Sequence, residues 1–121
     1  MNPNGSERRK YPRLDNNIPL KISSDECDVV TETRNISCVG AYCQVDKYLE
    51  PMTKLKIHLL IPCKKRNTMS ARKISCQGVV VRIESLPANH NFNAAIYFND
   101  IKEKDRRCLA DYIDATFAKK H

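Results

Sequence analysis

The alternation of apolar and polar side chains is the feature that most constrains the fold of this chain. In the segment 55–61, Leu or Ile occupies every second position, and Pro62 is predicted to end the segment. This period of two is typical of a strand that buries one face. Alternation or a run of β-branched residues predicts five more strands, over residues 18–22, 27–34, 41–45, 72–84 and 92–98. The chain is therefore predicted to be mostly β-structure.

The connections between these segments are too short for parallel crossovers, so we expect antiparallel pairing. They are a turn at 35–40, a basic polar connection at 63–70 and a hairpin connection at 87–91. Pro19 is expected near a strand start or an edge, and Gly78 at a bulge or a close backbone contact.

The period changes only after about residue 101, where apolar residues recur at helical spacing. This stripe consists of Cys108, Leu109, Tyr112, Ile113 and Phe117. Asp100 is the expected cap of the helix, with Glu103 completing a capping-box-like pair. Because closure removes exposed edges, we predict an all-β fold with a C-terminal α-helix, namely a six-stranded antiparallel β-barrel. The helix would cover one mouth of the barrel or pack on a partner.

A chain of 121 residues fits one domain. We expect a flexible tail over 1–7 and a single domain over 8–118. No apolar run is long enough to span a bilayer, and the basic N-terminus is not followed by the apolar stretch of a secretory signal. The expected location is the cytoplasm, without membrane insertion.

Six cysteines are many for a chain of this length. A zinc site would favour a C-x-x-C pair, and the nearest pair, Cys38 and Cys43, has four residues between its members. Nothing supports export to a compartment that forms disulfides. We therefore expect reduced thiols that fill the core, with a metal site or a disulfide as the alternatives. The six are Cys27, Cys38, Cys43, Cys63, Cys76 and Cys108.

The sequence does not indicate an enzyme. His58 is placed on the polar face of a strand, His90 in a turn, and His121 at the last position, so none can be paired with a nucleophile. The motifs of metalloproteases, P-loops and dinucleotide-binding turns are absent from the sequence. No catalytic residue, metal ligand or resident cofactor is predicted.

Two polar stretches could instead bind an anion. The first is Arg8-Arg9-Lys10-Tyr11-Pro12-Arg13, in which four cations lie within six residues just before the first strand. Guanidinium groups pair bidentately with phosphate or with O6 and N7 of guanine, so this stretch suits an anionic purine ligand. The second is Asn35-Ile36-Ser37-Cys38-Val39-Gly40, where Gly40 would allow a positive φ or a close approach of ligand.

Together, Arg9-x-x-x-Arg13 and Asn35-x-Ser37-x-x-Gly40 resemble the two motifs of the PilZ domain family, R-x-x-x-R and [D/N]-x-S-x-x-G. The segments 78–82 and 95–98 are similar to two later strands of that family, with Ala95 in place of its usual glycine. The resemblance extends over residues 8–115 and implies the same barrel and terminal helix.

The resemblance also implies a ligand, the bacterial second messenger cyclic di-GMP. Arg9 and Arg13 would hold guanine edges and phosphates, with Arg8 as a neighbour. Asn35 and Ser37 would hydrogen-bond the ligand, and Gly40 would shape the turn. Binding is expected to fold the arginine arm over the barrel and to signal to a protein partner. Asn35 lacks the negative charge of the alternative aspartate, which predicts weaker binding.

Other functions stay open at this point. The net charge of +7 and the clusters Lys64-Lys65-Arg66 and Arg72-Lys73 would suit single-stranded nucleic acid. Few aromatic residues are available for stacking, so nucleic acid is the less favoured partner. A barrel that binds no nucleotide and acts only through protein contacts is a third possibility. One ligand or a stacked pair, and a monomer or a homodimer, all fit the sequence.

Overall fold

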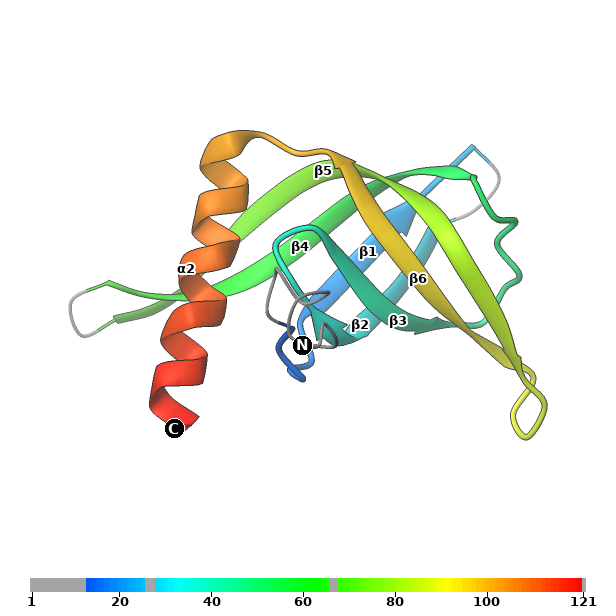
Figure 1. Ribbon diagram of the computed structural model, residues 1–121, viewed down its shortest axis with the longest axis horizontal. Coiled ribbons are helices and arrows are strands. Elements are labelled where there is room, and N and C mark those ends of the chain that lie inside the picture. The colour runs from blue at the N-terminus through cyan, green and yellow to red at the C-terminus, as the bar shows by residue number, and fades with distance from the viewer. Residues whose placement is uncertain (1–12, 26–27, 66–67, 121) are drawn as a thin grey trace, which may run out of the picture.

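The computed structural model describes residues 13–25, 28–65 and 68–120, without the side chains of 63–65 and 119–120. Its strands are β1 (Pro19–Ser23), β2 (Asp28–Ile36), β3 (Gly40–Val45), β4 (Lys54–Lys65), β5 (Thr68–Leu86) and β6 (Asn91–Asp100), and they precede the helix α2 (Glu103–Lys120). The strands form a closed barrel in the order β1-β2-β3-β6-β5-β4, and every neighbouring pair is antiparallel. Figure 1 shows α2 across one end of this barrel. The predicted fold class is confirmed.

The alternating residues fill the barrel interior. Leu55, Ile57, Leu59 and Ile61 are all at most 3% exposed, so the segment with the clearest period of two supplies much of the core. From α2, Leu109 and Ile113 are buried in the same core. The apolar stripe of the helix therefore covers the barrel, which was one of its two expected roles.

Polar contacts to the rest of the chain also position α2. Arg72 of β5 forms an ion pair with Asp105 at 3.1 Å. The Asn16 amide donates a hydrogen bond of 2.8 Å to the Tyr112 hydroxyl. Both contacts join residues far apart in the sequence, so they fix the helix relative to the barrel wall.

The prediction that Asp100 caps α2 was wrong. Asp100 is the last residue of β6, and the helix begins at Glu103. The Arg106 amide donates to the carbonyl oxygen of Lys102 at 2.9 Å, so Lys102 is the residue at the helix boundary. Pairing of Asp100 with Gln77 keeps Asp100 in the sheet, two residues too early to cap the helix.

The predicted end of the strand at Pro62 and the predicted polar connection at 63–70 were also wrong, because β4 and β5 continue through both as a paired hairpin. The pairing runs from Pro62↔Ala71 to Lys65↔Thr68. The pairing of β1 with β4 ends at Leu59, so Pro62 lies where β4 has a free edge and its missing N–H is tolerated. In Figure 1 this hairpin extends past α2, beyond the barrel.

Pro19 opens β1, as expected for a proline in a sheet. At Gly78 the register between β5 and β6 shifts, and an added Cβ would lie 2.8 Å from the Ile96 Cγ2 atom. Both the bulge and the close contact predicted at Gly78 are therefore present.

No disulfide joins the cysteines whose side chains the structure describes. Cys43 and Cys76 are buried, as predicted for core-filling residues, and burial raises the pKa of each to about 12. Cys38 and Cys108 are only partly buried. Cys27 and the Cys63 side chain lie outside the described part of the chain.

Candidate functional site

The segment before β1 is joined to the end of β2, and this places Arg13. Leu14 and Ile36 exchange two backbone hydrogen bonds, of 2.8 and 3.0 Å. Arg13 therefore lies next to Asn35, and its Nη1 atom donates to Asn35 Oδ1 at 2.6 Å. Two residues that are 22 positions apart, one from each motif, thus meet on the exposed surface. Arg8 and Arg9 lie outside the described residues.

A buried threonine keeps this segment in place. The Thr33 hydroxyl accepts a hydrogen bond from the Ile18 amide at 3.0 Å and donates one to the Asn16 carbonyl at 2.7 Å. Thr33 is fully buried, so the bond from the Ile18 amide is shielded from water, whereas the bond to the Asn16 carbonyl is partly buried. Sequence reasoning missed this residue, although its signal was present: Thr33 is a polar residue at an inward-facing position of β2.

The second motif forms the turn between β2 and β3, residues 37–40, which we call the motif turn. The Ser37 amide donates to the Gly40 carbonyl at 2.8 Å, and the Ser37 hydroxyl accepts from the Val39 amide at 3.2 Å. Ser37 is only 1% exposed. Its hydroxyl shapes the turn in this structure, whereas Asn35 and Arg13 present their polar groups outward.

Gly40 is required by the approach of β6. A Cβ at this position would lie 2.5 Å from the Ile96 carbonyl oxygen, far inside normal contact distance. Among the described glycines none has a positive φ, so that part of the prediction was wrong. The glycine instead lets the motif turn lie directly against the neighbouring strand.

The strand registers place the site within a row on the outer barrel wall. Asn35 pairs with Tyr42, Tyr42 with Ala95, and Ala95 with Arg82. The Tyr42 hydroxyl donates to Glu84 at 2.6 Å, and this bond raises the pKa of Tyr42. Arg82 lies 3.8 Å from the same carboxylate. The carboxylate of Glu84 beside the site is therefore already bound by Tyr42 and Arg82.

Arg13 has no such counter-charge within the described chain. Its hydrogen-bond partner, Asn35, is neutral, and no ion pair to Arg13 is found there. The asparagine in this motif thus leaves the full charge of the guanidinium available to an anionic ligand.

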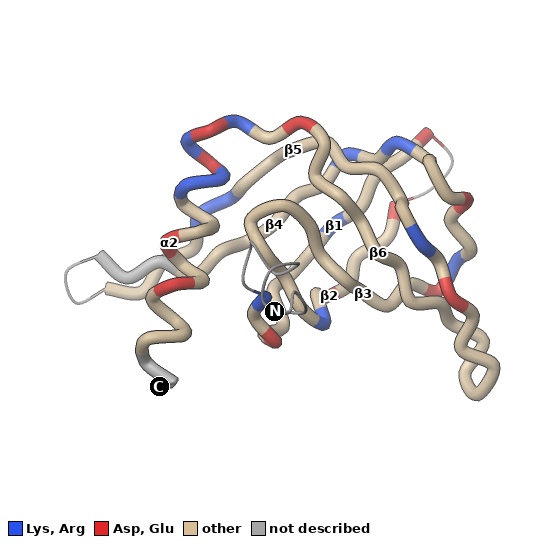
Figure 2. The backbone as a smooth tube through the Cα atoms, viewed as in Figure 1, with Lys and Arg blue, Asp and Glu red and all other residues tan. Residues whose placement is uncertain are grey.

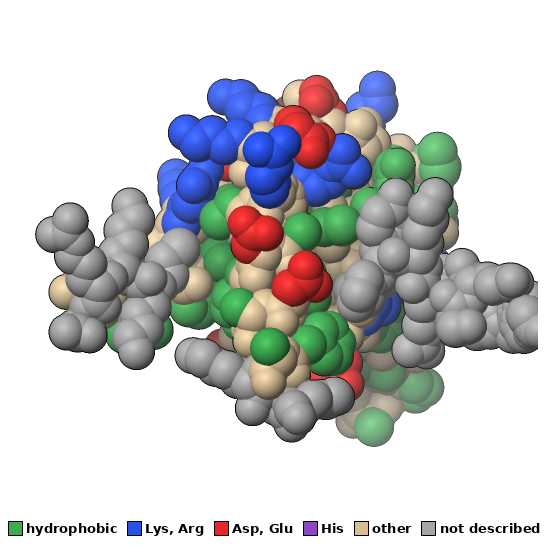
Figure 3. All heavy atoms as spheres, turned by 60° about the vertical axis from the view of Figure 1, so that its left-hand side comes forward, with side chains coloured by type: hydrophobic (Ala, Val, Ile, Leu, Met, Phe, Trp, Pro, Cys, Tyr) green, Lys and Arg blue, Asp and Glu red, His purple; other side chains and the backbone are tan. Residues whose placement is uncertain are grey.

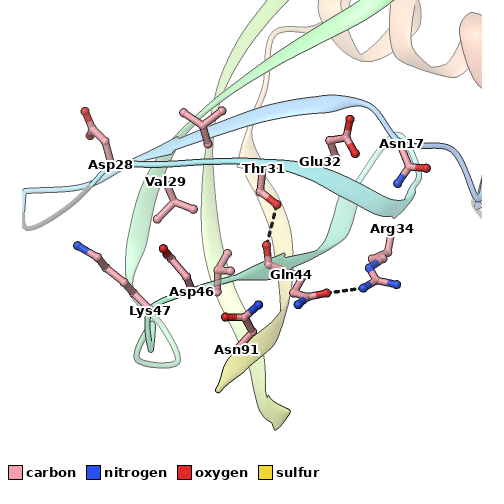
Figure 4. Close-up of a pocket in the computed structure, with 12 residues that line it drawn as sticks. Asn17, Asp28, Val29, Thr31, Glu32, Arg34, Gln44, Asp46, Lys47 and Asn91 are labelled. Carbon is pink, nitrogen blue, oxygen red and sulfur yellow. Dashed lines mark hydrogen bonds between the residues drawn. The ribbon is translucent and has the colours of Figure 1, made fainter. Parts of the chain in front are cut away.

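A larger pocket, of about 760 Å³, opens beside the site where β2 and β3 separate (Figure 4). Pairing between these strands is limited to Thr33–Ile36, and beyond it Thr31 donates a side-chain bond to the Gln44 carbonyl at 2.7 Å. The charged residues that line the pocket are Asp28, Glu32, Arg34, Asp46 and Lys47. Three carboxylates against two cations disfavour a doubly charged anion, so this pocket does not suit one.

His58 lies on the outer face of the barrel, and its Nδ1 atom is 2.9 Å from the Ser75 hydroxyl. Sequence reasoning missed this pair, which the register of β4 with β5 brings together. Burial lowers the pKa of His58, and the charges of three lysines lower it further; these are Lys73, Lys21 and Lys56. No carboxylate among the described residues orients the imidazole, so there the pair does not show the arrangement of a nucleophile, its base and an orienting acid. His90 is a turn residue with a φ of 60°. His121 lies outside the described residues.

Solved structures share this fold. The Bacillus subtilis inhibitor of motility (MotI/DgrA) superposes with a TM-score of 0.81 at 22% identity, over 94% of this chain and 53% of that one. The chain thus spans about half of that protein. The PilZ domain of YcgR from Escherichia coli, solved with c-di-GMP, superposes with a TM-score of 0.64 at 11% identity, over 93% of this chain and 94% of that one. Among curated protein sequences, none matches significantly.

Within the described residues, α2 does not have the apolar content needed to cross a bilayer. The family model of the PilZ domain matches residues 7–115, which include both motifs, the whole barrel and most of α2. Members of this family are ligand-binding regulatory modules. The chain therefore belongs to the PilZ domain family.

Proposed function

We propose that this chain is a receptor for cyclic di-GMP and that the ligand binds where Arg13 meets Asn35. The hydrogen bond of 2.6 Å between these two residues carries the proposal, because it joins the two family motifs at one surface position. The PilZ domain of YcgR was solved with the same ligand, which supports this choice.

Binding starts from a charged guanidinium that is held only by a neutral amide. Arg13 can leave the Asn35 oxygen and pair with a phosphate, or with O6 and N7 of a guanine. The amide of Asn35 then turns to the ligand, while Ser37 and Gly40 keep the motif turn in shape. Arg8 and Arg9 supply further positive charge from the N-terminal side.

We propose that the ligand orders the arm of residues 8–13 over the barrel and that a protein partner recognises the ordered arm. Ordering costs about 1–2 kcal/mol for each residue, which charge-assisted contacts to two phosphates must offset. The Leu14–Ile36 bridge supports this view, because it fixes one end of the arm beside the site.

Isothermal titration with cyclic di-GMP tests the site. Arg13→Ala should weaken binding by about 30- to 150-fold, since a lost charge-assisted contact costs about 2–3 kcal/mol. The matched control is Arg34→Ala, which removes an exposed arginine that is bonded to Gln44. This control should bind within about threefold of the wild type. Equal affinities of the two variants would refute the site.

The identity of the ligand is tested by titrating cyclic di-GMP, GMP and a single-stranded oligonucleotide, each at two salt concentrations. Saturable binding that prefers the cyclic dinucleotide is the expected result. Binding with a steep salt dependence and no preference for it would instead indicate nucleic acid. An absence of binding to all three would favour a module that acts only through protein contacts.

A further inference from the structure

A second pocket, of about 230 Å³, lies where the motif turn meets β6, whereas Arg13 lies beside β2; β3 separates the two strands. Three parts of the chain form it: the motif turn, the end of β6 with the residues that follow, and α2. Its lining residues are Cys38, Val39, Tyr97, Phe98, Asn99, Asp100, Ile101 and Arg106. None of them was singled out as a ligand-binding residue by the sequence. The pocket is adjacent to the proposed site because Cys38 and Val39 belong to the motif itself.

Tyr97 gives this pocket an aromatic surface. Tyr97 is 49% exposed, and within the described chain its side chain forms no hydrogen bond or ring contact. Across the sheet it pairs with Gly40, which has no side chain to cover the ring. An exposed aromatic ring can stack on a nucleic-acid base, and such a contact strengthens binding by about 5- to 150-fold.

Arg106 gives the pocket a positive group. Its guanidinium bonds Glu103 at 2.5 Å, and its charge also acts on the Cys38 thiol of the motif turn. Figure 2 shows a cluster of Lys and Arg, interspersed with Asp and Glu, along the first half of α2, and Figure 3 shows both kinds of side chain on the surface there. The cluster includes Lys104, Arg106 and Arg107. Glu103 and Asp105 lie among these basic residues, so the first turns of α2 carry only a small excess of positive charge, and the cation that lines the pocket is Arg106.

The polar groups of the pocket match one base better than the others. An arginine donates to O6 and N7 of guanine, and a carboxylate accepts from the N1–H and N2–H groups on the opposite edge. Arg106 and Asp100 are the charged residues that line the pocket. Adenine has an amino group in place of O6, so it would place a donor against the arginine.

We propose that this pocket holds one guanine base of the cyclic di-GMP bound at the motif turn, a proposal that rests on the proposed function. Tyr97 stacks on the base, Arg106 donates to its O6 and N7 atoms, and Asp100 accepts from its other edge. The strand of Asn35 and that of Tyr97 are two strand spacings apart, about 10 Å, with β3 between them. A cyclic dinucleotide can therefore contact Arg13 and Tyr97 together.

Titration of matched variants tests the subsite. Tyr97→Leu removes the ring and keeps apolar bulk, and it should weaken binding of cyclic di-GMP by about 10-fold or more. Tyr97→Phe keeps the ring and should bind within about twofold of the wild type. Arg106→Gln should weaken binding by about 10-fold. Its control is Arg107→Gln, which removes the same charge from the adjacent, 72% exposed side chain and should change affinity by less than about threefold.

A spectroscopic readout separates contact with the base from an indirect effect. The chain contains no tryptophan, so Tyr97→Trp introduces a single indole. Its emission should be quenched when guanine stacks on it, at the same ligand concentration that saturates the calorimetric signal. Thermal melts of all variants check that each one folds.

The outcomes distinguish the subsite from the receptor function. Wild-type affinity of Tyr97→Leu or of Arg106→Gln, in a protein that loses binding on Arg13→Ala, overturns the subsite and leaves the receptor. Unchanged indole emission on saturation also overturns it. If the wild-type chain does not bind cyclic di-GMP, both proposals fail.

Discussion

Replacement of Gly40 by alanine tests whether the motif turn depends on direct contact with β6. An alanine Cβ would lie 2.5 Å from the Ile96 carbonyl oxygen, so one of the two strands must shift by several tenths of an ångström. The bonds at risk are Ser37 amide to Gly40 carbonyl and Phe98 amide to Val39 carbonyl, both 2.8 Å.

The expected loss of stability follows from these contacts. Overpacking of a rigid site costs about 1–3 kcal/mol, and each weakened backbone hydrogen bond adds about 0.5–1.5 kcal/mol. A strand shift that weakens the hydrogen bonds also relieves the overpacking, so the two costs do not add in full. Gly40→Ala should therefore lower the free energy of unfolding by about 2–4 kcal/mol. For a domain of this length the corresponding drop in Tm is about 8–16 °C.

Gly78→Ala is the matched comparison. Its Cβ would meet the Ile96 Cγ2 atom at 2.8 Å, which is the end of a side chain, and the Tyr97 carbonyl at only 3.2 Å. A side-chain methyl moves more easily than a backbone carbonyl, so this variant should lose less stability. Differential scanning calorimetry gives both values. A Tm for Gly40→Ala within 2 °C of the wild type, or above that of Gly78→Ala, would refute the reasoning.

Four further predictions concern single side chains. Thr33→Val leaves a buried amide without its acceptor and should cost about 1–3 kcal/mol in urea unfolding. Asn35→Asp adds a carboxylate that can accept from guanine but that would also pair with Arg13 in the free chain. An exposed ion pair is worth at most about 1 kcal/mol, less than a charge-assisted contact to the ligand, so cyclic di-GMP binding should still tighten about fivefold in calorimetry; equal or weaker binding would count against the guanine contact. Cys43, with its pKa raised to about 12, should resist iodoacetamide at pH 8 until the chain unfolds, as peptide mass spectrometry would show. Because the pKa of His58 is lowered from 6.5 in the folded state, the unfolded state binds its proton more readily. Stability should therefore fall as the pH drops through 6.5, and His58→Gln should flatten this dependence.

The fold was largely predictable because its strands bury one face and expose the other. Residues 55–61 illustrate this, since their period of two matches their burial in β4 residue by residue. The hairpin beyond Pro62 was not predictable from this signal. Exposed residues such as Met69 and Ser70 have no buried face there, so their side chains need no alternation while the backbones pair.

The site was predictable in its residue types but not in its arrangement. The sequence indicated Arg13 and Asn35, whereas their contact depends on the Leu14–Ile36 bridge, which no local pattern predicts. The need for Gly40 arises in the same way from a distant residue, Ile96. Long-range pairing decides both features, and local sequence spacing does not report it.

The Leu14–Ile36 bridge also has a mechanical consequence. Two hydrogen bonds connect this point to the barrel, and they are the first bonds to carry load when a force is applied to the chain through residue 13. A ligand that binds both Arg13 and the barrel wall would carry part of the force that otherwise acts on these two hydrogen bonds. In an optical trap, bound cyclic di-GMP should therefore raise the force of the first rupture step. The force at which the strands unfold afterwards should be the same with and without the ligand.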